Sequence, residues 1–113
     1  MASVKYIVEH TYPEGVLLPR DMIEFRDYYD KMPVVASLTL MDVKIGTVGG
    51  VTTKTVTYEC TDAVLLAAHR DSITKSLLSD KIWQHIQKNK ITRRDQVRDL
   101  VTNEIIEDWT SQY

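Results

Sequence analysis

Hydrophobic and polar residues alternate with a period of two in two segments of the first sixty positions. Val4–Tyr12 and Val51–Cys60 both follow this pattern, which predicts two strands that each have one largely apolar face. Between them, Val34–Ile45 is the most apolar stretch of the chain, and its β-branched residues predict a strand buried on both faces for much of its length. Gly46–Gly50 then predicts a hairpin turn into Val51–Cys60.

Apolar residues at helical spacing fill most of the remaining chain. A first helix is expected from Pro19 to Pro33, and a second from a cap at Thr61-Asp62 toward Leu77. A third helix is expected to begin at Ser79 or Asp80 and to weaken at Asn89-Lys90. Beyond it, the capping pattern Thr92-x-x-Asp95 precedes an apolar stripe that predicts a final helix, formed by Val97, Leu100, Val101, Ile105 and Trp109.

These elements predict an α+β fold. Their order is β-α-β-β-α, which is most of a ferredoxin-like unit with an antiparallel sheet, followed by a helical C-terminal extension. The length of 113 residues fits a single domain over residues 1–113, with the sheet-and-helix unit at about 1–79 and the extension at 80–113. No fourth strand is evident after the second helix.

Two segments resemble small dimeric α+β-barrel proteins. Lys5–Gly15 looks like their first strand and loop, and Phe25–Asp30, soon followed by Pro33, is similar to the first helix of some of them. The resemblance covers about the N-terminal two-thirds of the chain. It implies that two protomers pair their sheets and leave a pocket between sheet and helices. It also implies a role like that of the superfamily's members, which include cofactor-free oxygenases and isomerases.

The composition excludes several classes of protein. With 43% hydrophobic and 27% charged residues the chain is in the ordinary globular range, and a net charge of −2 disfavours nucleic acid and anionic membranes as partners. Cys60 is the single cysteine, so no internal disulfide is possible. No apolar run reaches the roughly 20 residues of a membrane helix, and no signal-peptide pattern occurs at the start. We therefore expect a cytoplasmic protein.

His10 is the best single candidate for chemistry. It shares a strand face with Tyr6 and Tyr12, and Tyr58 on the hairpin is expected on the same face of the sheet. An imidazole among phenols could transfer protons near neutral pH, so His10 is the candidate catalytic residue and the three tyrosines are candidate ligand-binding residues. The alternative is a hydrogen-bonded His10 at the sheet end with tyrosines that fill the core. No spacing of His, Cys or acidic residues indicates a metal, and nothing indicates a cofactor.

A second functional hypothesis uses the uneven charge of residues 81–98. This segment carries basic residues that could bind a protein or a nucleic acid, namely Lys88, Lys90, Arg93, Arg94 and Arg98. The alternative is a solvated helical hairpin whose cations neutralise the acidic tail. The sequence thus favours a small-molecule-binding or cofactor-free catalytic protein over a non-enzymatic accessory factor or inhibitor. It leaves open whether the chain is an enzyme. Apolar faces left uncovered in so short a chain predict a homodimer.

Overall fold

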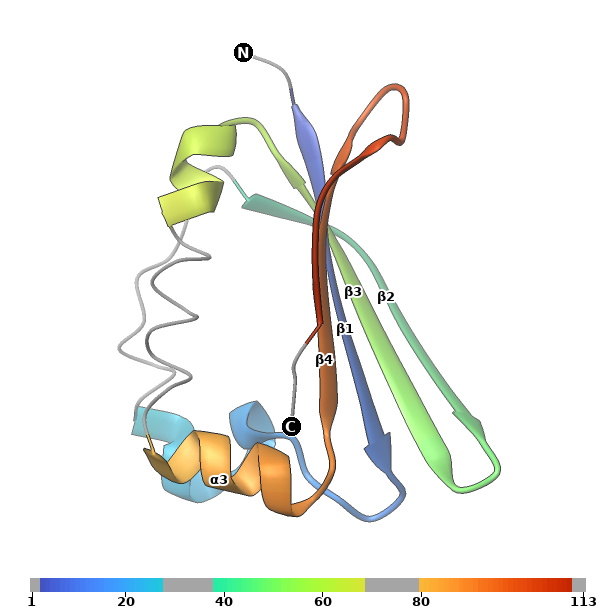
Figure 1. The fold of residues 1–113 in the computed structure, drawn as a ribbon, viewed down its shortest axis with the longest axis vertical. Helices are drawn as coiled ribbons and strands as arrows, with labels where there is room; N and C mark the ends of the chain where they lie inside the picture. The colour runs from blue at the N-terminus through green and yellow to red at the C-terminus, as the bar shows by residue number, and fades with distance from the viewer. Residues whose placement is uncertain (1–2, 28–37, 69–79, 111–113) are drawn as a thin grey trace.

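The computed structural model of the chain describes residues 3–27, 38–68 and 80–110. Five strands form one antiparallel sheet in the order β2-β3-β1-β4-β5. The helices of the described chain all lie on one side of this sheet (Figure 1). The strands are β1 (Val4–Pro13), β2 (Leu38–Val48), β3 (Val51–Cys60), β4 (Thr92–Asp99) and β5 (Ile105–Thr110).

Helical segments of the described chain lie near both ends of the sheet. The short 3-10 turns η1 (Pro19–Asp21) and η2 (Ile23–Phe25) lie beside α3 (Asp80–Lys88) at one end. A helix over residues 63–68 lies near the other end (Figure 1). It begins as the sequence predicts, because Asp62 Oδ1 accepts hydrogen bonds from the backbone N–H groups of Val64 and Leu65 at 3.0 and 3.1 Å.

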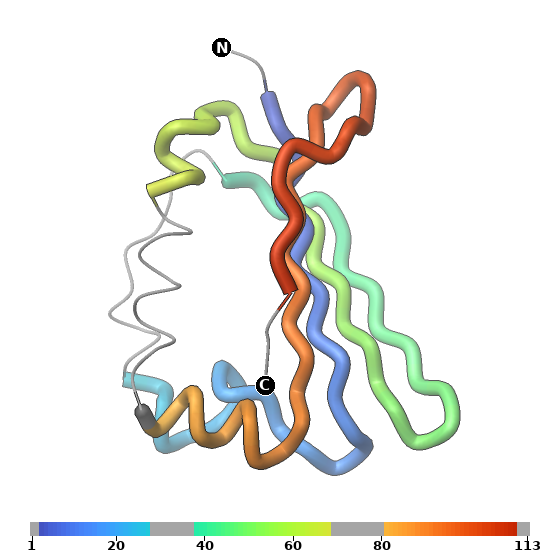
Figure 2. Tube along the Cα trace, in the orientation of Figure 1, coloured from blue at the N-terminus to red at the C-terminus, as the bar shows by residue number. Residues whose placement is uncertain are grey.

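The predicted β-α-β-β-α order with a helical C-terminal extension is wrong. Figure 2 follows the chain from α3 directly into β4, which runs beside β1, and then through a hairpin into β5. The apolar stripe that predicted a final helix is broken by a turn, in which Asp99 Oδ1 accepts hydrogen bonds from the N–H groups of Val101 and Thr102, both at 2.9 Å. Asn103, with φ of +62°, completes the turn. The chain combines an antiparallel sheet with helices, as α+β proteins do, in an order that the periodicity did not reveal.

Two of the predicted strands agree with the structure. Val51–Cys60 is β3, and Val4–Tyr12 lies within β1. Gly49 and Gly50 join β2 to β3 with φ of +59° and +78°, values that a two-residue hairpin turn requires and that glycine adopts without strain. The expected burial of the apolar stretch is wrong from Thr39 to Ile45, because these residues are exposed on the edge strand β2. The start of that stretch, residues 34–37, lies outside the described residues.

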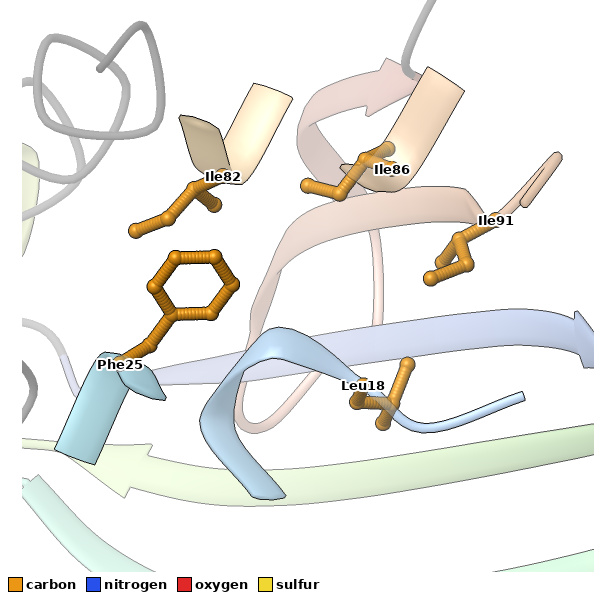
Figure 3. Packing of buried hydrophobic residues seen from close by; sticks show 5 residues of the cluster. All are labelled: Leu18, Phe25, Ile82, Ile86 and Ile91. Carbon is orange, nitrogen blue, oxygen red and sulfur yellow. The ribbon is translucent and has the colours of Figure 1, made fainter. Parts of the chain in front are cut away.

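Two hydrophobic clusters hold the helices to the sheet. One lies between the 3-10 turns and α3 (Figure 3) and contains Leu18, Phe25, Ile82, Ile86 and Ile91. The other joins the 63–68 helix to the far end of the sheet and contains Val4, Tyr6, Cys60, Leu66 and Val97. The burial of Ile82 and Ile86 confirms the predicted inward face of the third helix. The predicted first helix beyond residue 27, and the second helix beyond residue 68, lie outside the described residues.

Candidate functional site

The helix-facing side of the sheet collects the side chains that sequence analysis singled out on β1 and β3. Tyr6 is directly opposite Tyr58, and His10 is directly opposite Lys54 of β3 and Arg93 of β4. Residues opposite one another in an antiparallel ladder point to the same face. The structure therefore places Tyr6, His10, Tyr12 and Tyr58 on one face, and it adds two cations that flank His10. We call Lys54, His10 and Arg93 the cationic row.

A buried polar network lies beside the cationic row. The Tyr6 hydroxyl donates a hydrogen bond to Asp95 Oδ2 at 2.8 Å, and Arg93 Nη2 lies 3.4 Å from both the hydroxyl oxygen and that carboxylate oxygen. Only 11% of the Arg93 side chain and 8% of the Asp95 side chain are exposed. Since buried charges are costly unless they are paired and hydrogen-bonded, this network explains how β4 carries two charged residues inward.

His10 lies in a strongly electropositive and partly buried position. The pKa of His10 is lowered from 6.5 to about 3, first by burial and then by the neighbouring positive charges of Arg93 and Lys54. The imidazole is therefore neutral at physiological pH. A neutral ring offers one donor and one acceptor nitrogen, so His10 can hydrogen-bond a ligand without carrying charge.

The tyrosines flank this position along the strands. The rings of Tyr6 and Tyr58 stack with their centroids 6.1 Å apart and their planes at 27°. Tyr6 belongs to the cluster at the 63–68 helix and Tyr58 packs against that cluster, whereas Tyr12 packs against the cluster at α3. His10 thus lies on the stretch of β1 between the two clusters, with an aromatic ring toward each end.

The basic residues of the second hypothesis do not share one surface. Arg93 points to the helix-facing side, whereas Arg94 and Arg98 point to the opposite side of β4. Arg94 is engaged by Asp108 at 2.9 Å, and Arg98 donates to Gln96 Oε1 at 3.2 Å. Lys88 and Lys90 lie exposed at the end of α3 and in the following turn. Because residues 92–99 form a strand and not the predicted helix, these cations lie on different sides of the sheet.

Two other polar side chains have structural roles. Cys60 is fully buried, and its Sγ donates to the Asp62 carbonyl oxygen at 3.2 Å, which fits a small core residue better than a nucleophile. His85 Nε2 lies 2.8 Å from the Leu17 carbonyl oxygen, and its Nδ1 lies 3.2 Å from Asn89 Nδ2. The Asn89 amide can only donate there, so Nε2 carries the proton and ties α3 to the loop before η1.

Sequence analysis missed Lys54 and Asp95 as members of the site. Strand alternation places Lys54 on the same face of β3 as Tyr58, so its side of the sheet could have been predicted. That Lys54 lies opposite His10 depends on the register between β1 and β3, which the sequence does not show. Asp95 could not be found, because the segment that contains it was predicted as helix. Among residues 3–27, 38–68 and 80–110, no group of three His, Cys, Asp or Glu side chains could hold a metal ion.

Comparisons with known proteins add no assignment. No protein-family model, curated protein or solved structure matches this chain. The likeness to dimeric α+β-barrel proteins stays a prediction from the sequence. In the part of the chain that the structure describes, no helix is long and apolar enough to span a membrane. The function is therefore inferred from the geometry of the site.

Proposed function

We propose that the protein binds a small organic anion at the cationic row, on the helix-facing side of the sheet. The observation that carries this proposal is the placement of His10 directly between Lys54 and Arg93 on neighbouring strands. Directly opposite side chains on adjacent strands have Cβ atoms about 4.5–5.5 Å apart. Three hydrogen-bonding groups, two of them cationic, can therefore converge on one carboxylate or phosphate.

The charge balance of the row favours an anion. Asp95 compensates the Arg93 charge. Within the described residues, no ion pair joins Lys54 to a carboxylate, and its cross-strand neighbours on this face are His10 and Ile45. One positive charge is therefore left without a counterion at a partly buried position. A bound anion would neutralise it.

The environment of His10 favours binding over proton transfer. A general base works best when its pKa is near the working pH, and an imidazole with a pKa of about 3 is far below it. The catalytic role predicted for His10 would need a ligand that raises this pKa. An anion does so, because its negative charge stabilises the imidazolium. Tyr58 and Tyr12 supply aromatic surface on either side, which suits a ligand with an apolar or aromatic body.

The test is an NMR titration of His10 with small anions. The probes are benzoate, 4-hydroxybenzoate, citrate and inorganic phosphate. The His10 resonance is to be assigned by its absence from the spectrum of His10→Gln. A bound probe is expected to move the His10 ring signals and to raise the pKa of His10 by one unit or more, about 1.4 kcal/mol of coupling. If none of the four probes perturbs these signals at millimolar concentration, the proposal fails.

A matched pair of variants locates the binding. Lys54→Gln removes the uncompensated charge of the row and is expected to weaken probe binding about tenfold. Lys5→Gln removes an equally charged residue from β1, on the opposite side of the sheet, and is expected to leave binding unchanged. Equal weakening by both variants would indicate nonspecific attraction between the protein and the probe.

The homodimer predicted from the sequence also belongs to this proposal. Its support is the number of large apolar side chains that remain exposed along the two edge strands. Isolated apolar residues on a surface are ordinary, whereas a run of them along one strand marks an interaction surface. The exposed large apolar residues of β2 and β5 are Leu40, Met41, Val43, Ile45, Val48, Ile105, Ile106 and Trp109.

A further inference from the structure

Strand β2 is a long edge of the described sheet. It pairs along one side with β3, and ten of its eleven residues, from Thr39 to Val48, are exposed. An exposed edge presents a row of backbone N–H and C=O groups that can pair with another strand. The apolar side chains of β2 make this edge a candidate interface, because burial of apolar surface adds to strand pairing.

The two faces of β2 differ in chemistry around its centre. Val43 and Ile45 lie on the helix-facing side, where their registers with Val56 and Lys54 place them. Asp42 and Lys44 lie on the other side, and the Lys44 Nζ atom is 3.9 Å from Asp42 Oδ2. Opposite charges two residues apart on one strand face can each meet the opposite charge when the strand pairs with a copy of itself.

We propose that β2 pairs antiparallel with β2 of a second copy, about a two-fold axis at Val43. This inference rests on the homodimer proposed above and assigns its surface and register. With the axis at Val43, Asp42 lies opposite the partner's Lys44 and Lys44 lies opposite the partner's Asp42. Val43 meets the partner's Val43, and the two five-stranded sheets become one continuous sheet.

Neighbouring registers are less complementary. An axis at Lys44 would place Lys44 opposite the partner's Lys44, and like charges directly opposite one another destabilise strand pairing. An axis at Ile45 would place Lys44 opposite the partner's Gly46, which offers no charge. Of these three registers, the one with its axis at Val43 places both Asp42 and Lys44 opposite a residue of opposite charge.

Backbone geometry supports the same axis. Val48 and Val51 flank the two-residue turn, so they form the hydrogen-bonded pair that closes the hairpin. Hydrogen-bonded and non-hydrogen-bonded pairs then alternate along the ladder, which makes Val43 and Val56 a non-hydrogen-bonded pair. The N–H and C=O of Val43 consequently point away from β3, toward the free edge, where the partner's Val43 can receive them.

Cysteine cross-linking tests the register. Val43→Cys places two thiols at the axis, about 5.5 Å apart between Cα atoms, which a disulfide can bridge. Val48→Cys is the control, because Val48 is 83% exposed but its two copies would lie about 30 Å apart. Cys60 is fully buried, so the wild-type chain is expected to stay uncross-linked. Under mild oxidation we expect a covalent dimer from Val43→Cys and none from Val48→Cys.

A charge exchange and the mass in solution complete the test. We expect about 26 kDa, twice the 13.0 kDa of one chain, with Lys44→Glu weakening the dimer about tenfold and Asp42→Lys combined with Lys44→Glu restoring it. A dimer that does not cross-link at position 43 would overturn this surface while leaving the homodimer. A monomeric mass at all concentrations would overturn both. The anion titration is independent of either outcome.

Discussion

Arg93 and Arg94 are neighbours on β4, yet they make ion pairs on opposite sides of the sheet. Arg93 points toward the helices and pairs with Asp95 at 3.4 Å, in a network that includes the Tyr6 hydroxyl. Arg94 points the other way and pairs with Asp108 through two hydrogen bonds, at 2.9 and 3.1 Å. The exposed pair has the shorter contacts.

Burial, not distance, decides how much each pair matters. The side chains of Arg93 and Asp95 are 11% and 8% exposed, against 46% and 35% for Arg94 and Asp108. Water solvates either member of the exposed pair when the other is removed, so its loss costs little. Removal of one member of the buried pair takes this ion pair away from a charge that water scarcely reaches, which is strongly destabilising. The pair with the shorter contacts, Arg94 and Asp108, is therefore expected to contribute less to stability than Arg93 and Asp95.

Removal of the inward arginine is the largest expected effect. Arg93→Met is expected to lower the free energy of unfolding by about 3–5 kcal/mol, because Asp95 loses its buried counterion. Equilibrium urea denaturation measures this change. Arg93→Met combined with Asp95→Leu removes both charges and is expected to recover part of the loss. A loss below about 1 kcal/mol for the single variant would place the pair with ordinary surface pairs.

A pH change tests the electrostatic environment of the same side of the sheet. The unfolded chain protonates His10 near pH 6.5, whereas the folded chain resists protonation until about pH 3. Unfolding therefore takes up a proton between these values, and stability falls as the pH falls through this window. Between pH 7.5 and pH 5 the contribution of His10 is a loss of roughly 2 kcal/mol. His10→Gln cannot titrate and is expected to lack this part of the pH dependence in urea denaturation; an unchanged profile would contradict the lowered pKa.

The outward pair is expected to give the smallest effect. Arg94→Met should change the urea midpoint by a small fraction of the change caused by Arg93→Met. The hydrogen bond from Arg94 is the main cause that lowers the pKa of Asp108 below its ordinary value. A lowered carboxyl pKa contributes stability that is present above about pH 3.8 and is lost at lower pH, so Asp108→Asn should matter least in acid. Equal effects of the inward and outward variants would mean that burial does not distinguish the pairs.

Local sequence signals were sufficient where one element buries one apolar face. The alternation in Val4–Tyr12 and Val51–Cys60 revealed two strands, and the spacing of Ile82 and Ile86 revealed α3. The same signals failed in β4. Its inward positions include Arg93 and Asp95, and of its residues only Val97 is a buried hydrophobic, so no period-two pattern is visible there. The apolar residues that continue to Trp109 then matched helical spacing by coincidence.

The chain alone determined which segments carry an alternating or helical apolar face, because those patterns depend only on neighbours in sequence. It also showed that His10 shares a strand face with Tyr6 and Tyr12. The tertiary structure decided that residues 92–99 form a strand beside β1, and it thereby brought Asp95 to the hydroxyl of Tyr6, 89 positions away. Only that pairing makes an inward Arg93 and Asp95 tolerable, since the free energy of a buried charge depends on partners that no local pattern can identify.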